Sequence, residues 1–235
     1  MVRENRSGET RALRLLRVSG MLVLVLAAVL LSTSPKKPVH ANVPGFRDVV
    51  VGFELASTPD QVFGILGYPQ DPDRAATVSA MDLTNKIDFA FMIAYPLFFF
   101  AIALLLASRQ AVPKWFLPVC ALLALTMGVA DALENRQLLL LSQTIDPASM
   151  ASPLARLRLF TALKWSAIAV TSGLVALRLW RDASLWRWSA LTFGLSALLS
   201  LLAFRDVSWL EAAANLVAVG WLLTWVYALR ARAGA

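Results

Sequence analysis

Apolar residues run along this chain in stretches close to 20 residues long, separated by short polar segments. A helix rises about 1.5 Å per residue, so about 20 apolar residues cross the roughly 30 Å hydrocarbon layer of a membrane. The pattern predicts an all-α, polytopic transmembrane helix bundle with five or six spans. The predicted spans are Val18–Ser34, Ile87–Ala107, Trp115–Leu133, Leu157–Leu179, Leu185–Phe204 and Trp209–Leu229.

The first apolar stretch has two interpretations. Residues 1–17 form a basic arm, and residues 18–34 follow either as a signal-anchor helix or as the core of a signal peptide extending to residue 41. Val39, His40 and Ala41 offer small residues near a cleavage position, whereas Lys36 and Lys37 count against cleavage. We favour the anchor, which gives six spans. Cleavage would leave five.

Residues 35–85 are predicted to form an outward-facing segment between the first two spans, and residues 86–235 a five-helix membrane bundle. Within the outer segment the sequence predicts a short amphipathic helix over Pro59–Leu66. Thr58 fits its N-cap, Gln61 fits the third helical position of a capping box, and Gly67 ends it. Such a helix is suited to a membrane surface or to capping the bundle.

Composition agrees with a membrane protein, because 58% of residues are apolar and only 16% are charged. The net charge of +7 comes from arginines at the ends of apolar stretches, which indicates topology rather than nucleic-acid binding. The densest basic clusters fall on one side of a six-span arrangement. We therefore predict a multi-pass membrane protein with cytoplasmic N- and C-termini.

Cysteine and histidine are too scarce for several kinds of site. Cys120 is the only cysteine and His40 the only histidine, which excludes a disulfide framework, a cysteine metal cluster and a haem held by two histidines of one chain. The sequence predicts no metal site and no cofactor.

Charged and amide side chains inside apolar helices are the candidate functional residues, since a central Asp or Lys costs roughly 2.5–3.5 kcal/mol on insertion scales. Counting residues along the helices puts Asp131 and Lys164 at similar depths, so we expect an ion pair between adjacent helices. A purely structural role as interhelical pairs is the alternative, favoured for Asp88 and Glu211 at predicted helix starts. The predicted outward-facing pocket comprises Glu54, Asp88, Tyr95, Asp131, Glu134, Asn135, Lys164, Glu211 and Asn215.

Three short patterns resemble a family of uncharacterised bacterial integral membrane proteins. They are Phe53-Glu54-Leu55-Ala56-Ser57-Thr58, then Asp88-Phe89-Ala90-Phe91 with Tyr95, then Glu134-Asn135. The resemblance covers roughly residues 50–180. It implies a bacterial inner-membrane protein with no established activity, and it transfers no catalytic residues to this chain.

Three functions remain open from the sequence. The first is a protein that binds a small apolar or lipid ligand, or a membrane-protein partner, through the outward-facing polar pocket, with membrane lipids as its surroundings. The second is a membrane-embedded enzyme acting on a lipid, with Asp131 or Glu134 as acid or base and Lys164 as electrostatic stabiliser. The third is a small ion- or proton-coupled transporter. We prefer the first, because the inner halves of the spans are almost purely apolar and no histidine lies in a span.

Overall fold

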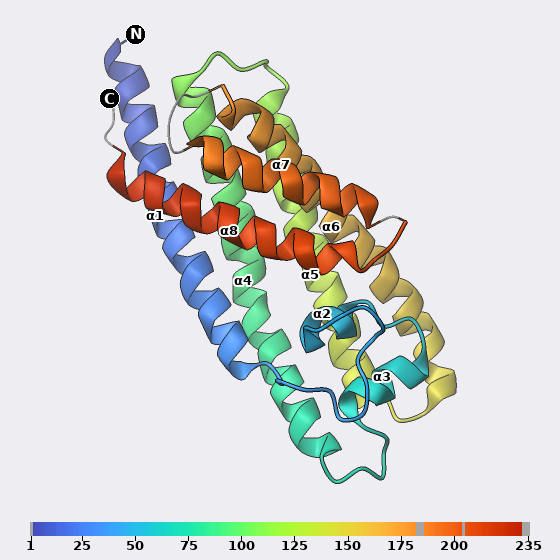
Figure 1. Cartoon of the computed structure of the whole chain (residues 1–235). Helices are drawn as coiled ribbons and strands as arrows, with labels where there is room; N and C mark the ends of the chain where they lie inside the picture. Colours follow the sequence, from blue (N-terminus) through green and yellow to red (C-terminus); the bar gives the residue numbers. More distant parts are fainter. Residues whose placement is uncertain (1, 182–185, 204, 232–235) are drawn as a thin grey trace. The chain divides into compact units, whose positions relative to one another are not determined.

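A computed structural model of the chain describes residues 2–181, 186–203 and 205–231, without the side chains of residues 2–6 (Figure 1). The described residues form helices and no strand, which confirms the all-α prediction. The helices are α1 (Val2–Thr33), α2 (Val49–Glu54), α3 (Pro59–Leu66), α4 (Arg74–Arg109), α5 (Phe116–Gln143), the 3-10 helix η1 (Pro147–Met150), α6 (Ala151–Leu179), α7 (Trp186–Leu202) and α8 (Trp209–Arg230).

Five of these helices are long and apolar enough to cross a membrane, namely α1, α4, α5, α6 with η1, and α8. The chain is therefore compatible with a multi-pass membrane protein. α7 has 17 residues, or about 26 Å of helix, which is shorter than the hydrocarbon layer. Leu185 and Phe204, the predicted ends of that span, lie outside the described residues.

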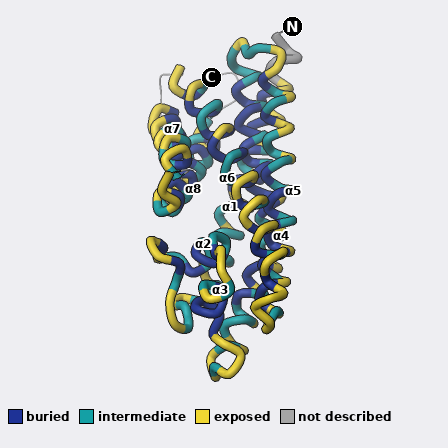
Figure 2. Tube along the Cα trace, turned by 90° about the vertical axis from the view of Figure 1, so that its right-hand side faces the viewer, coloured by how far each residue is buried: buried dark blue, intermediate teal, exposed yellow. Residues whose placement is uncertain are grey.

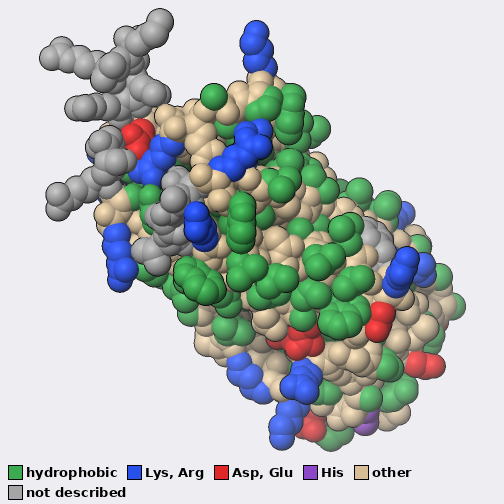
Figure 3. Space-filling model, turned by 45° about the horizontal axis from the view of Figure 1, so that its top comes forward, with side chains coloured by type: hydrophobic (Ala, Val, Ile, Leu, Met, Phe, Trp, Pro, Cys, Tyr) green, Lys and Arg blue, Asp and Glu red, His purple; other side chains and the backbone are tan. Residues whose placement is uncertain are grey.

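Many large apolar side chains lie on the surface of the helices, and they cover much of the face seen in Figure 3. Leu122 is 63% exposed, Leu125 64% and Leu177 69%. A soluble monomer rarely leaves so much contiguous apolar surface in water. Contact with lipid hydrocarbon accounts for it.

Two helices begin earlier than the sequence predicts. α1 starts at Val2, so residues 2–17 of the basic arm belong to the helix, and Leu13 and Leu16 in this part are buried. α4 starts at Arg74, although the second span was expected from about residue 86. Its early turns are anchored by Met81, which is fully buried. Polar residues between the apolar positions made the helical period of these turns hard to recognise in the sequence.

The chain divides into two compact units, which are described separately. The first comprises Met1–Val25, Ile93–Met127 and Trp165–Ala235, and the second comprises Leu26–Met92 and Gly128–Lys164. The helices α1, α4, α5 and α6 contribute residues to both.

In the first unit, arginines of α1 and α4 connect these helices to the end of α8. Arg17 of α1 donates from Nε to the Ala228 carbonyl of α8 at 2.8 Å. Arg109, the last residue of α4, donates to Glu9 Oε1 at 2.6 Å and to Tyr227 Oη at 2.8 Å. The N-terminal half of α1, the end of α4 and the end of α8 therefore share one end of this unit.

The helices α7 and α8 pack as an antiparallel pair within the same unit (Figure 1). The rings of Trp186 and Tyr227 have centroids 3.8 Å apart, which joins the start of α7 to the end of α8. At Gly220 an added Cβ would lie 2.7 Å from the Phe193 ring, so glycine permits this close approach.

A reporter fused to the C-terminus is expected to lie on the same side of the membrane as one inserted after Gln110, because Arg109 bonds to the end of α8. Reporters after Asp71 and after Asp146 are expected on the opposite side. Paired alkaline phosphatase and green fluorescent protein fusions measure this. A C-terminal reporter on the side of Asp146 would show that α7 does not cross the membrane.

In the second unit, α2 and α3 cover a core that also draws on α4, α5, η1 and α6. Figure 2 shows buried residues prevailing along α3, and five of its eight residues are buried. The core consists of Val43, Phe46, Val49, Phe53, Ala56, Val62, Phe63, Ile65, Leu66, Met81, Leu138, Leu141, Met150, Leu154 and Leu157. Apolar residues of the outer segment therefore form one core together with residues of α4, α5, η1 and α6.

Local hydrogen bonds explain both short helices. α3 has the bounds that the sequence predicts, with Thr58 Oγ1 accepting from the Gln61 amide at 3.3 Å. The Gln61 side chain reaches the Ser57 amide at 2.7 Å rather than that of the N-cap residue, so the capping box is shifted by one position. Asp48 is the N-cap of α2, and its carboxylate accepts from the amides of Val50 and Val51.

Candidate functional site

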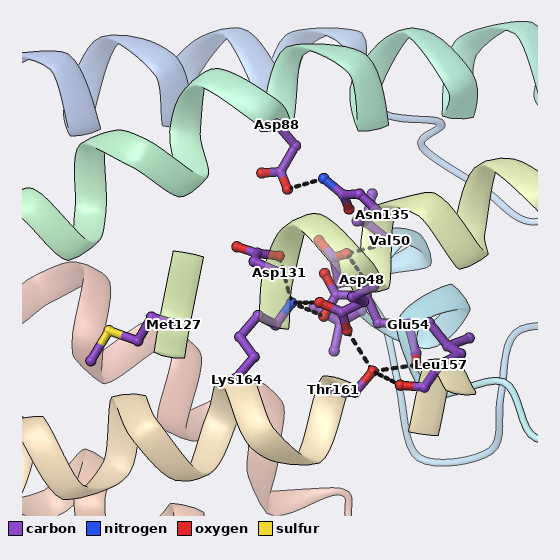
Figure 4. A network of polar contacts seen from close by, with 12 residues as sticks. Asp48, Val50, Glu54, Asp88, Met127, Asp131, Asn135, Leu157, Thr161 and Lys164 are labelled. Atoms are coloured by element: carbon purple, nitrogen blue, oxygen red, sulfur yellow. Dashed lines mark hydrogen bonds and ion pairs between the residues drawn. The ribbon is translucent and has the colours of Figure 1, made fainter. Parts of the chain in front are cut away.

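The ammonium group of Lys164 lies at the centre of a buried acidic cluster in the second unit (Figure 4). Its Nζ is 3.0 Å from Glu54 Oε2 and 3.4 Å from Asp131 Oδ1, and it also contacts Glu134 Oε2. The ion pair between Asp131 and Lys164 is the contact that the sequence predicts. Glu54 and Glu134 share the same lysine.

Helical spacing brings these side chains to one place. Asp131 and Glu134 are three residues apart on α5, and Thr161 and Lys164 are three apart on α6, so each pair lies on one helix face. Thr161 Oγ1 donates to Glu134 Oε1, and its oxygen lies 3.3 Å from the Glu54 carbonyl oxygen. Both carboxylate oxygens of Glu134 therefore have a partner, one in Thr161 and one in Lys164.

Glu54 reaches the cluster from outside the long helices, as the last residue of α2. A carboxylate is unfavourable at a helix C-terminus, where the peptide dipoles leave partial negative charge, and Lys164 offsets this. Burial raises the pKa of Glu54 above its ordinary value, and the nearby Lys164 ammonium opposes that rise. Glu54 thus links the outer segment to the membrane helices.

The loop before α2 fixes where Glu54 lies. Asn42 Nδ2 donates to the carbonyl oxygens of Phe46 and Asp48, at 3.3 and 2.9 Å, and Asn42 Oδ1 accepts from the Val43 amide at 2.9 Å. Gly52 of α2 packs directly against this amide, with no room for a side chain. The loop and α2 therefore form one rigid support for Glu54.

A second polar pair extends the cluster to α4. Asn135 Nδ2 donates to Asp88 Oδ2 at 2.7 Å and lies 3.4 Å from the Asn85 carbonyl oxygen. Asn135 is buried and Asp88 half-buried. The sequence placed Asp88 at a helix start, which is wrong, because α4 begins at Arg74 and Asp88 lies well inside it. A favourable interaction with a helix N-terminus therefore does not explain why an acid stands at position 88.

The remaining three predicted pocket residues belong to the first unit. Tyr95 is 2% exposed, its hydroxyl lies 3.5 Å from the Met127 carbonyl oxygen, and its ring contacts Trp221. Glu211 lies in the first turn of α8, where the sequence expects a helix start, and Asn215 is exposed one turn later. The structure brings together the other six, Glu54, Asp88, Asp131, Glu134, Asn135 and Lys164.

Two residues absent from the predicted pocket join it. Thr161 bonds to Glu134, and its position three residues before Lys164 on α6 is the signal that indicates a shared face. Asn85 is 2% exposed and lies three residues before Asp88 on α4, and its Nδ2 atom finds no hydrogen-bond partner among the residues that the structure describes. Both residues can be recognised in the sequence as polar side chains that lie three positions from a charged residue inside an apolar helix.

Acidic groups outnumber basic ones in this cluster. The side chains of Glu134, Asp131, Lys164 and Glu54 are 0%, 5%, 6% and 15% exposed, and half-buried Asp88 lies on the next helix. Four ionised carboxylates beside one ammonium would leave an uncompensated negative charge in a poorly hydrated place, which is costly. A further cationic group beside these carboxylates would therefore be favourable.

His40 lies apart from the cluster, on the outer segment. Its Nε2 is 2.6 Å from Asp71 Oδ2, and this hydrogen bond, with one from the Tyr68 amide, lowers the pKa of Asp71 below its ordinary value. Within the part of the chain that the structure describes, no group of three or more His, Cys, Asp or Glu side chains has a geometry that holds a metal ion.

Comparison of the chain with models of protein families, with curated proteins and with solved structures finds no match in any of the three. The resemblance to bacterial integral membrane proteins stays a prediction.

Proposed function

We propose that this chain is a multi-pass protein of the bacterial inner membrane that binds a small ligand with a cationic head and an apolar body, such as a lipid-like amine. The binding site is the cluster of Glu54, Asp131, Glu134 and Lys164 in the second unit. One observation carries the proposal, namely that the Lys164 ammonium contacts three buried carboxylates at once.

The chemistry of recognition follows from that arrangement. A ligand ammonium has the same charge and hydrogen-bond donors as the Lys164 side chain. It would therefore either displace Lys164 from the acids or bind to them beside it. The apolar side chains of Phe53 and Leu157 belong to the buried core beside Glu54 and Thr161, which suits an alkyl body. A lysine or arginine of a membrane-protein partner has the same chemistry.

The ligand class is tested with decylamine as probe and decanol as its uncharged control, on the full chain in a neutral detergent. Decylamine is expected to raise the melting temperature and decanol to leave it unchanged. Asp131→Asn should weaken decylamine binding about tenfold, on the order of one charge-assisted hydrogen bond.

Asp82→Asn is the matched control for that experiment. Asp82 is a half-buried acid of α4 in the same unit, and it accepts hydrogen bonds from Ser142 and Gln143. Its replacement should leave the decylamine affinity unchanged. Equal stabilisation by decylamine and decanol, or equal losses in the two variants, would refute the proposal.

Proton-coupled transport is a second candidate, supported by the gradient of exposure from Glu54 at 15% through Asp131 at 5% to Glu134 at 0%. This order suits the passage of a proton from the outer segment into the bundle. Accumulation of an amine in proteoliposomes under an imposed pH gradient, beyond that in protein-free liposomes under the same gradient, would select it over simple binding.

An enzyme that uses Asp131 and Glu134 as acid and base draws less support. Both Glu134 oxygens already have partners in Thr161 and Lys164, and a general base must reach the proton it removes.

A further inference from the structure

A groove between α6 and α7 in the first unit has the composition of a lipid site. Its volume is about 630 Å³. Small residues form part of its lining, and the Cβ of Ala176 on α6 lies 3.7 Å from the place where a Cβ on Gly194 of α7 would stand. Because neither side chain is large, the two helices approach closely here, and these small residues form the floor of the groove.

Large apolar and aromatic side chains border this groove. Leu177 is 69% exposed and Leu191 40%, and both face the groove from different helices. Trp115 and Trp180, 50% and 59% exposed, also line it. Tryptophan favours the boundary between headgroups and hydrocarbon, so these rings indicate the depth at which a headgroup would lie.

Two arginines lie at that same depth. Arg178 in the last turn of α6 and Arg181 just beyond it both line the groove. The Arg178 guanidinium lies over the Phe116 ring, 5.5 Å from its centroid, which holds the charged group in place. Among the residues that the structure describes, no carboxylate pairs with either arginine.

We propose that this groove binds an anionic phospholipid, whose phosphate contacts Arg178 and Arg181 while one acyl chain lies along Ala190, Leu191 and Gly194. Basic pockets between membrane helices on the cytoplasmic side favour anionic headgroups. The groove belongs to a different unit from the acidic cluster, so this inference is independent of the proposed function.

Native mass spectrometry of the full chain tests the proposal, with phosphatidylglycerol, phosphatidylcholine of identical acyl chains, and inorganic phosphate as probes. Phosphatidylglycerol should be retained and should raise the melting temperature, whereas phosphatidylcholine and phosphate should do neither. Equal retention of the two lipids would overturn the proposal. Equal protection by inorganic phosphate would show a site for the free ion and would overturn it as well.

Two variants distinguish the contribution of the lipid headgroup to binding from that of the acyl chain. Arg178→Gln with Arg181→Gln should weaken phosphatidylglycerol binding about 30-fold, at about fivefold per arginine. Gly194→Leu, which fills the groove without changing its charge, should weaken it by a similar factor. Arg136→Gln with Arg156→Gln removes two exposed arginines of the other unit and should have no effect. Unchanged binding in both groove variants would place the lipid elsewhere.

Discussion

Lys164→Met is expected to lower the free energy of unfolding by about 3–5 kcal/mol, because it leaves Glu54, Asp131 and Glu134 without their shared cation. The side chain of Lys164 is only 6% exposed, so water cannot replace its charge. Denaturation of the full chain in mixed detergent micelles measures the change. Lys86→Met is the control, since Lys86 is an exposed lysine of α4 in the same unit.

Adding Asp131→Leu to Lys164→Met distinguishes a simple pair from a shared lysine. If Asp131 and Lys164 formed an isolated ion pair, as the sequence suggests, replacing both would be nearly neutral. The structure leaves two further carboxylates at the vacated position, so the double variant should recover only a small part of the loss. Full recovery would contradict the contacts of Glu54 and Glu134 with Lys164.

Gly52→Ala is expected to lower the free energy of unfolding by about 1–3 kcal/mol through overpacking. The new methyl group would stand 1.9 Å from Asn42 Oδ1. Asn42 cannot turn away without losing its hydrogen bonds to Val43, Phe46 and Asp48, each worth about 1 kcal/mol. Hydrogen exchange and denaturation should both report a loosened outer segment.

The matched control for Gly52→Ala is Gly8→Ala. Gly8 is also helical, and an added Cβ there meets nothing within 4 Å. Alanine favours a helix over glycine by about 1 kcal/mol, so this variant should be neutral or slightly stabilised. Similar losses at Gly8 and Gly52 would mean that the contact with Asn42 is not the cause.

The long helices and α3 were predictable because their signals are local. Apolar stretches of about 20 residues predict the long helices, and Thr58, Pro59 and Gly67 mark the two ends of α3. α2 was not predictable in the same way. Its six residues are too few for a helical period, and Val49, Val50 and Val51 have β-branched side chains that weakly disfavour a helix. The N-cap hydrogen bonds of Asp48 and burial of Phe53 decide its conformation.

The acidic cluster was predictable only in part, for a geometric reason. Counting residues along a helix gives the depth of a side chain, and this was enough to match Asp131 with Lys164. It does not tell which neighbouring helix a side chain faces. That Glu134 also reaches Lys164, and that Glu54 arrives from outside the long helices, depends on how α2, α5 and α6 pack. Sequence periodicity carries no information on that packing.

The sharing of one lysine among several acids has a consequence for how this chain can change during evolution. Each acid is one of three around Lys164, so exchanging any one of them for an amide leaves the ammonium with two partners and removes part of the charge excess. Stability alone therefore tolerates an amide at position 54, 131 or 134, one at a time, so retention of all three acids among descendants would reflect ligand binding, whereas position 164 must remain basic for stability as long as any two of those acids persist.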